Sequence, residues 1–158
     1  MKENTKQLII SQGYNQEAIK SNKNLDLLIR WTPFACGLSG TIGLFLQNPY
    51  YFMFLGMLTA IGGLGSVSFY DYIYNYTLRY VLASGKVPLH GPQRRFGCSV
   101  GAILFITGGI GFYLENPWLA YIPTGFIICL AYIAAITQWC FASTLYNLLW
   151  GKQLNQCC

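Results

Sequence analysis

Three long stretches of the chain contain no charged side chain, and their lengths predict its architecture. Residues 31–70, 96–114 and 116–151 lack Asp, Glu, Lys and Arg. A helix needs about 20 mainly apolar residues to cross the roughly 30 Å hydrocarbon core of a bilayer. The first stretch can therefore hold two crossings, and each of the others can hold one. The pattern predicts four transmembrane helices, at about residues 31–47, 50–70, 96–114 and 118–138.

Two Asn-Pro pairs predict where the chain turns between these helices. Asn48-Pro49 interrupts the first uncharged stretch, and Asn116-Pro117 separates the third predicted helix from the fourth. Proline lacks an amide donor and disfavours helical geometry in the residue before it. We therefore expect structural turns at both pairs and an all-α, polytopic membrane fold.

The two turns lie within a repeated sequence. Residues 40–49 and 108–117 are identical at six of ten positions, at a spacing of 68 residues. Each repeat holds two predicted helices, so each enters and leaves the membrane on the same side. The sequence thus predicts two parallel helical-hairpin repeats, at about residues 31–82 and 96–150, related by an axis along the membrane normal.

The repeat also predicts what flanks the helices. Aromatic-rich segments follow the second and the fourth helix at the same spacing, and every fourth residue from Tyr72 to Tyr80 is a tyrosine. Such side chains favour the headgroup region, so we expect each of these helices to continue beyond the bilayer core as one long helix. Residues 25–150 then form the membrane domain, between a polar segment at 1–24 and a tail at 151–158.

Composition agrees with a membrane location, and the positions of the charges predict the orientation. Only 15 of the 158 residues, or 9%, are charged, whereas soluble domains have about 25%. All ten Lys and Arg residues lie before the first predicted helix, between the second and third, or after the fourth. The positive-inside rule then places both termini and the central loop in the cytoplasm and the protein in the plasma membrane. Lipid headgroups account for the net charge of +5, so we expect no nucleic-acid partner.

Few side chains offer chemistry of the usual kinds. The predicted helices contain no ionisable carboxylate, amine or imidazole, which argues against an ion-coupled transporter. Asp71 and Glu115 lie at helix ends, where we interpret them as structural, and His90 has no ligand-spaced partner for a metal. We therefore expect no metal and no cofactor, and the sequence favours a role other than that of an enzyme.

Three of the six cysteines form the most distinctive reactive set. Cys36 and Cys98 begin the first and third predicted helices and Cys140 lies at the end of the fourth, so all three are expected in one layer near the cytoplasmic face. Cytosolic conditions disfavour a structural disulfide. The three are then either small apolar packing residues, which the sequence favours, or redox or soft-metal thiols. In the second interpretation Cys140 is the principal catalytic thiol, and Cys98 and Cys36 are its resolving or partner thiols.

Two segments resemble a known family. Residues 91–96, Gly-Pro-Gln-Arg-Arg-Phe, are similar to a Gly-Pro-basic-Arg-Phe helix start, and residues 139–146, Trp-Cys-Phe-Ala-Ser-Thr-Leu-Tyr, to a Cys-x-x-Cys-x-x-Tyr motif. Both are features of a bacterial integral-membrane family, domain of unknown function 4395, which the chain resembles over about residues 24–150. The resemblance implies four spans in a bacterial inner membrane but no established activity. Ser143 replaces the second cysteine, so a disulfide within the motif cannot form.

These observations leave three functional hypotheses. The leading one is a component of a thiol-linked sulfur or redox system or of a membrane assembly. Its partners are then the lipid bilayer, a membrane or thioredoxin-like protein, and a second copy of the chain. One alternative is a channel or carrier for a small solute, with a site on the repeat axis lined by glycine backbones and Ser or Thr hydroxyls. The other is a purely structural membrane subunit.

Overall fold

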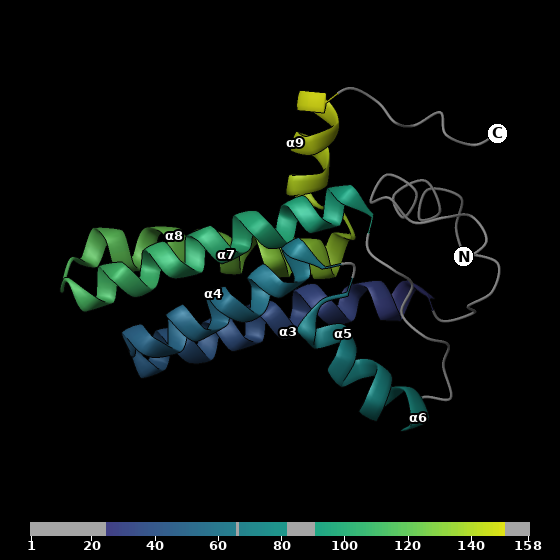
Figure 1. The fold of residues 1–158 in the computed structure, drawn as a ribbon, viewed down its shortest axis with the longest axis horizontal. Helices are drawn as coiled ribbons and strands as arrows, with labels where there is room; N and C mark the ends of the chain where they lie inside the picture. The colour runs from purple at the N-terminus through teal and green to yellow at the C-terminus, as the bar shows by residue number, and fades with distance from the viewer. Residues whose placement is uncertain (1–24, 66, 82–90, 151–158) are drawn as a thin grey trace.

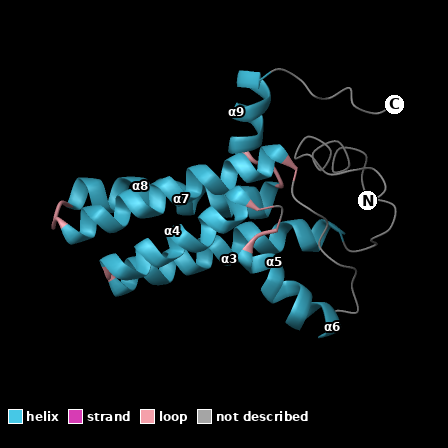
Figure 2. Cartoon of the chain, in the orientation of Figure 1, coloured by secondary structure: helices cyan, strands magenta, loops and turns pink. Residues whose placement is uncertain are grey.

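The structure, a computed structural model, describes residues 25–65, 67–81 and 91–150. Every regular element in these ranges is helical (Figure 2), which confirms the all-α fold class for the described part of the chain. In chain order the elements are α3 (Leu25–Leu46), α4 (Pro49–Leu64), α5 (Phe69–Ile73), the π-helix η1 (Tyr74–Leu78), α6 (Arg79–Val81), α7 (Pro92–Tyr113), α8 (Pro117–Thr137) and α9 (Phe141–Trp150).

Four long helices lie side by side as two antiparallel hairpins, α3 with α4 and α7 with α8 (Figure 1). α4 packs along α7, and α3 packs along α8, so each helix of one hairpin contacts a helix of the other. The short helices α5, η1 and α6 leave the bundle at the end opposite the two hairpin turns, and α9 leaves at that same end in another direction (Figure 1). The two ends of the bundle are therefore built differently.

Both hairpin turns are built from the Asn-Pro pairs in the same way. The side chain of Asn48 accepts hydrogen bonds from the amides of Tyr50 and Tyr51, and that of Asn116 accepts one from the amide of Leu119. Each asparagine thus caps a helix whose first residue is proline, a position at which the missing amide donor has no cost. The residue before each asparagine has a left-handed backbone, with φ of 49° at position 47 and 53° at position 115.

The core at the middle of the bundle is aromatic, and glycines let the helices approach closely. Phe52 of α4 and Phe105 of α7 are almost completely buried, and their ring centroids are 6.2 Å apart. Where α7 meets α8, a Cβ atom on Gly111 would overlap the backbone of Leu119 and Ala120. Only glycine fits at this crossing, as expected where small residues mediate helix packing in membranes.

The prediction of long continuous helices beyond the second and fourth spans is wrong. α4 ends at Leu64, and the chain bends by 84° before α5 begins. The break follows a glycine-rich segment, and a capping box of Ser68 and Asp71 starts the new helix. α8 likewise ends at Thr137, because Gln138 adopts a left-handed φ of 59° before α9 begins. The aromatic-rich segments are therefore separate short helices.

The helices identify a membrane protein, although fewer spans stand out than the four predicted. α7 and α8 are long and apolar enough to cross a membrane, and α4 with the bent α5–η1 segment forms a third candidate if that pair is one span. α3 has 22 residues, but it is the helix that contains Arg30 and several hydroxyl side chains and glycines, which lower its apolarity. The described helices thus include two candidate spans, or three with the bent pair.

The first and third helices also begin earlier than predicted, which places charges inside them. α3 starts at Leu25 and α7 starts at Pro92, so Arg30 lies within α3 and Arg94 and Arg95 lie within the first turn of α7. Residues 1–24, the loop that contains His90, and the tail with Cys157 and Cys158 lie outside the described residues.

Candidate functional site

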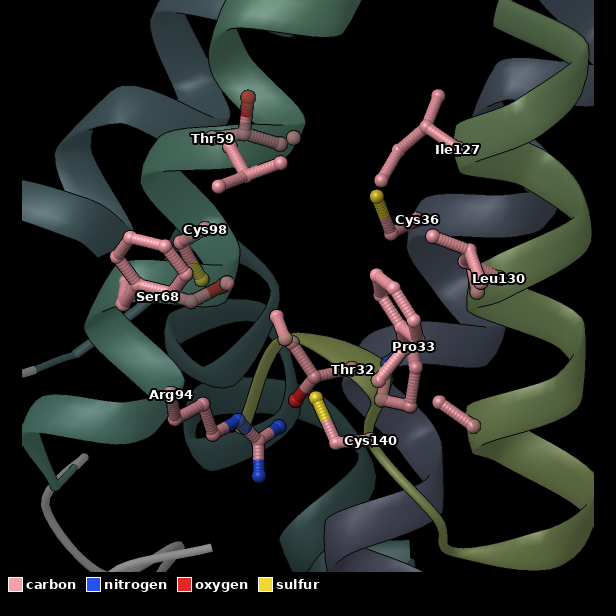
Figure 3. A pocket seen from close by; sticks show the side chains of 18 of the residues that line it. Thr32, Pro33, Cys36, Thr59, Ser68, Arg94, Cys98, Ile127, Leu130 and Cys140 are labelled. Atoms are coloured by element: carbon pink, nitrogen blue, oxygen red, sulfur yellow. The ribbon is translucent and has the colours of Figure 1, made fainter. Parts of the chain in front are cut away.

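A cavity of about 170 Å³ opens at the end of the bundle where α5 and α9 leave it. Its walls come from α3, α4, α5, α7, α8 and α9, and they are mainly apolar. Cys36, Cys98 and Cys140 all line this cavity (Figure 3). The structure therefore brings together the three thiols that the sequence singled out.

Each of the three thiols reaches the cavity from a different segment. Cys36 comes from α3, Cys98 from the second turn of α7, and Cys140 from the linker between α8 and α9. Cys36 and Cys98 lie on opposite sides of the cavity, with Cys140 below them (Figure 3). All three are half-buried free thiols, whereas Cys129 is exposed on α8 and does not line the cavity. Their chemical role stays a prediction.

One wall of the cavity is polar and is organised around Asp71, which is completely buried. Its Oδ1 accepts a hydrogen bond from the hydroxyl of Thr32 on α3, and its Oδ2 accepts one from the backbone amide of Ser68 at 3.0 Å. Arg94, which lines the cavity, and Asp71 both lie within electrostatic range of the Cys98 thiol. A buried guanidinium that lines the cavity and a buried carboxylate that does not line it thus act on the same thiol with opposite charge.

Two arginines hold the helix ends that frame the cavity. Arg30 of α3 donates to the carbonyls of Ala135 and Ile136 at the end of α8, at 3.3 and 2.8 Å. Arg95 of α7 donates to the carbonyls of Gly63 and Leu64 at the end of α4, at 3.2 and 2.6 Å. The last carbonyls of a helix lack partners within it and carry partial negative charge. Each arginine therefore stabilises the end of a helix in the other hairpin.

Sequence reasoning missed the polar wall. The sequence suggests a helix-end charge near water for Asp71 and marks Arg94 only as a basic residue of the segment 91–96; it gives no reason to single out Thr32 or Tyr70. One local signal was present, because Ser68-Phe-Tyr-Asp71 fits the capping-box pattern that starts a helix. The contact between Thr32 and Asp71 joins segments 39 residues apart, and no pattern in the sequence predicts it.

The thiols share a cavity without forming a metal site. Within residues 25–65, 67–81 and 91–150, no group of three or more His, Cys, Asp or Glu side chains is placed to hold a metal ion. The arrangement instead offers three separate sulfur atoms around a space that admits a small molecule. Such an arrangement can support exchange between a thiol and a disulfide.

Comparison with known proteins decides the family. A family model described as "Domain of unknown function (DUF4395)" matches residues 26–150. The chain belongs to this family. The match confirms the resemblance seen in residues 91–96 and 139–146. In this DUF4395 chain the matched region includes every residue that lines the cavity. Neither the curated proteins nor the solved structures contain a match to it.

This DUF4395 chain carries Ser143 one helical turn after Cys140, and the serine is buried. Its side chain is 3% exposed, and its hydroxyl has no hydrogen-bond partner within the described residues. Ser143 does not line the cavity. Any second thiol for Cys140 within the described chain must therefore come from another helix, and Cys98 and Cys36 are the two that share its cavity.

Proposed function

We propose that this protein is a four-helix membrane protein whose cavity carries out thiol-disulfide exchange on small sulfur compounds, as part of a thiol-linked sulfur or redox system. The observation that carries the proposal is the convergence of Cys36, Cys98 and Cys140 on one cavity. These residues are far apart in the sequence and come from three segments.

The open space beside the thiols argues against packing as their only role. Protein interiors are close-packed, and small residues that only fill space leave few voids larger than a water molecule. Here about 170 Å³ stays open, and a cavity of about 150 Å³ with aliphatic and aromatic walls is known to bind benzene. The cavity therefore has room for a molecule of about that size next to the sulfur atoms.

The exchange follows the ordinary course of thiol chemistry. The sulfur of Cys140 attacks one sulfur of a small disulfide; a mixed disulfide forms, the substrate S–S bond breaks, and the departing thiolate takes the proton that Cys140 gave up. Attack by Cys98 or Cys36 on the mixed disulfide releases the second thiol and leaves a protein disulfide. Two electrons have then passed from the protein to the substrate, and a dithiol partner of the thioredoxin-like class returns them.

Cys140 is the attacking thiol in this scheme because of its place in the chain. It lies in the linker before α9, whereas Cys36 and Cys98 lie within α3 and α7. A thiol on a short linker can approach a substrate and withdraw with less disturbance of helix packing than a thiol within a packed helix. We assign resolution of the mixed disulfide to the two helical thiols.

Four spans require α3 to cross the membrane despite its polar side chains, and its hydrogen bonds support this. The hydroxyls of Ser39 and Thr41 donate to the carbonyls of Ala35 and Gly37, at 2.8 and 2.9 Å. Arg30 is bound to the end of α8. Polar groups in a bilayer must find partners within the protein, and these groups have them.

The described charges support a cytoplasmic location for the cavity. The arginines of the described residues, at the start of α3, in α6 and at the start of α7, belong to the end of the bundle that contains the cavity. Glu115 lies in the α7–α8 turn at the opposite end. By the positive-inside rule we propose a plasma-membrane protein, in a bacterial inner membrane, with its cavity end toward the cytoplasm.

Packing between the hairpins supports the proposed duplication. If the hairpins arose by duplication, α3 corresponds to α7 and α4 corresponds to α8. The contact of α4 with α7 then has an equivalent in the contact of α8 with α3, and both contacts are present. Gly43 of α3 lies against Phe52 of α4, and Gly111 of α7 lies against Ala120 of α8. These two pairs of positions are each 68 residues apart, as the sequence repeat requires.

Reaction of the reduced, full-length protein with a small disulfide tests the function. The protein is placed in lipid nanodiscs and incubated with bis(2-hydroxyethyl) disulfide, and its thiols are mapped by mass spectrometry. We expect mixed disulfides or a protein disulfide at Cys36, Cys98 and Cys140, and a Cys129→Ser variant should behave in the same way. Cavity thiols that react only after denaturation contradict the proposal.

The competing channel function is tested in the same preparation. Gly40, Gly43 and Gly108 face side chains of neighbouring helices and not an open path, which disfavours a glycine-lined solute site on the repeat axis. We expect proteoliposomes to stay impermeable to small solutes such as glycerol and urea. A solute flux that persists after all three cavity cysteines are changed to serine would favour a channel or carrier.

A further inference from the structure

The rim of the cavity is apolar, whereas its polar groups lie inside. Phe126 of α8 and Phe141 of α9 line the cavity, and they are 50% and 41% exposed. The lining residues that carry a hydroxyl or a guanidinium are all buried. These are Thr32, Thr59, Ser68, Tyr70 and Arg94. The lining side chains that also reach the outer surface are therefore hydrocarbon rings.

α7 and α8 separate as they approach the cavity. A Cβ atom on Gly111 of α7 would meet the backbone of α8, whereas one on Gly101 would meet only the side chain of Ile127, at 3.6 Å. At Gly97 the atoms within 4 Å belong to α9 and the linker before it, and α8 contributes none. Gly97, Gly101 and Phe126 all line the cavity. The space between the two helices beside Phe126 is therefore the mouth of the cavity.

This mouth lies at the depth of the hydrocarbon core. α7 and α8 are the two described helices that are each long and apolar enough to cross a membrane. Phe126 lies near the midpoint of α8, about 14 Å from Pro117 and about 17 Å from Thr137 at helical rise. Because the hydrocarbon core is about 30 Å thick, an opening at Phe126 faces acyl chains and not water.

Cys36 is the deepest of the three cavity thiols. Its side chain packs with that of Ile127 against the aromatic core at the middle of the bundle, and the two lie on the same side of the cavity (Figure 3). Cys98 lies in the second turn of α7, and Cys140 lies in the linker at the end of the bundle. A molecule that enters at the depth of Phe126 is thus within reach of the Cys36 sulfur.

We infer that the cavity is loaded sideways from the bilayer, between α7 and α8, and that its substrate is a lipid-soluble disulfide. The inference rests on the proposed exchange function and names its substrate class. The volume of about 170 Å³ admits a group near the size of benzene, so a longer apolar chain extends through the mouth into the lipid. The substrate S–S bond breaks as in the proposed exchange, and the thiol products leave through the same mouth.

Charge excludes the water-soluble members of the same chemical class. A charged disulfide would lose its hydration in the hydrocarbon core and again in the mainly apolar cavity. Arg94 and Asp71 act on the Cys98 thiol with opposite sign, so together they favour neither charge in an occupant. The substrate is therefore uncharged at the end that enters the cavity.

Octadecyl methanethiosulfonate tests the inference, because its chain keeps it in the bilayer and is too long for the cavity. A protein thiol attacks the sulfenyl sulfur, the bond to the sulfonyl sulfur breaks, methanesulfinate departs and the thiol proton passes to water. One full-length chain keeps Cys36 and a second keeps Cys129, with every other cysteine changed to serine. Cys129 is exposed on α8 and does not line the cavity, so it gives the rate for a thiol that faces lipid.

In nanodiscs we expect intact mass to show one octadecylthio group on each of these chains. Phe126→Ala removes a ring from the mouth and should raise the rate at Cys36, relative to that at Cys129, severalfold. Ile122→Ala is the matched control. Ile122 is exposed one helical turn away on α8 and does not line the cavity, so this variant should react as the parent does.

Benzyl methanethiosulfonate, which fits the cavity whole, separates this inference from the proposed function. A Cys36 thiol that reacts with neither reagent overturns both. Reaction with the benzyl reagent but not with the octadecyl reagent overturns sideways loading alone. Faster reaction with the anionic sulfonatoethyl reagent than with the benzyl reagent does the same, because it would assign entry from water. Equal rates in Phe126→Ala and Ile122→Ala overturn the position of the mouth.

Discussion

Thr32 on α3 donates its hydroxyl hydrogen to the buried carboxylate of Asp71, 39 residues along the chain, with 2.5 Å between the two oxygens. The same carboxylate caps α5 through the amide of Ser68. One side chain thereby ties the first long helix to the short helix that leaves the bundle. The polar wall of the cavity depends on this tie.

Loss of the Thr32 hydroxyl should therefore weaken the fold. Thr32→Val keeps the shape and removes one donor from a buried carboxylate, so we expect a loss of about 1–3 kcal/mol in the free energy of unfolding. Thr107→Val is the control, because that hydroxyl bonds only the carbonyl of Ile103 in its own helix. Unfolding titrations in mixed detergent micelles should show the larger shift for Thr32→Val, and equal shifts would contradict the account.

Arg95 should stabilise α4 through the two carbonyls it binds. Arg95→Met removes both charge-assisted hydrogen bonds, and we expect it to cost about 1.5–3 kcal/mol. The stability of Arg95→Lys should lie between that of the parent protein and that of Arg95→Met, because an ammonium group cannot reproduce the forked geometry of a guanidinium. Arg79 lies over the ring of Tyr80 at 5.9 Å, and Arg79→Met provides the control with little expected effect. Thermal unfolding followed by circular dichroism measures all three variants.

The crossing of α7 and α8 should not tolerate a side chain at Gly111. A Cβ there would meet the backbone of Leu119 and Ala120, which cannot move aside, so Gly111→Ala should destabilise by about 1–3 kcal/mol. At Gly125 on α8 nothing lies within 4 Å of an added Cβ. Gly125→Ala should be neutral or slightly stabilising, since alanine favours helix more than glycine by about 1 kcal/mol. Equal effects at the two sites would refute the close approach.

Membrane topology can be tested with single cysteines. In a chain whose natural cysteines are serine, Gln47→Cys and Glu115→Cys should both react with an impermeant maleimide added outside the cell. Arg79→Cys should react only after the membrane is opened. Asp26→Cys, at the start of α3, should likewise react only after the membrane is opened. Together with the labelling of Gln47→Cys from outside, this result requires α3 to cross the membrane as the fourth span. Labelling of the two turn positions from opposite sides would remove α3 from the set of spans.

Local chemistry explains which features could be predicted from the sequence. The Asn-Pro turns follow from proline and capping asparagine alone, and they lie at the predicted positions. The convergence of three cysteines followed from their depth along predicted helices. The positions of the charged residues do not reveal the break after Leu64, because the uncharged stretch continues across it to Tyr70. The glycines and the Ser68 capping box were the relevant signal.

Tertiary contacts account for what the sequence could not reveal. The arginine caps at Arg30 and Arg95 join residues that are far apart in the chain, and only the packing of the hairpins brings them together. The buried position of Asp71 depends on the same packing. No periodicity or local motif encodes these contacts.

The central claim is that three thiols share one small cavity, and the stoichiometry of a benzyl adduct tests it most directly. Benzyl methanethiosulfonate is added in excess to the chain in which Cys129, Cys157 and Cys158 are serine, and intact mass counts the benzylthio groups. Variants that retain only Cys36, Cys98 or Cys140 should each accept one group. Because one ring of this size fills a cavity of about 170 Å³, the chain with all three thiols should retain at most one group, whether or not a neighbouring thiol resolves the first mixed disulfide. Two or three groups on the same folded chain would contradict the shared cavity.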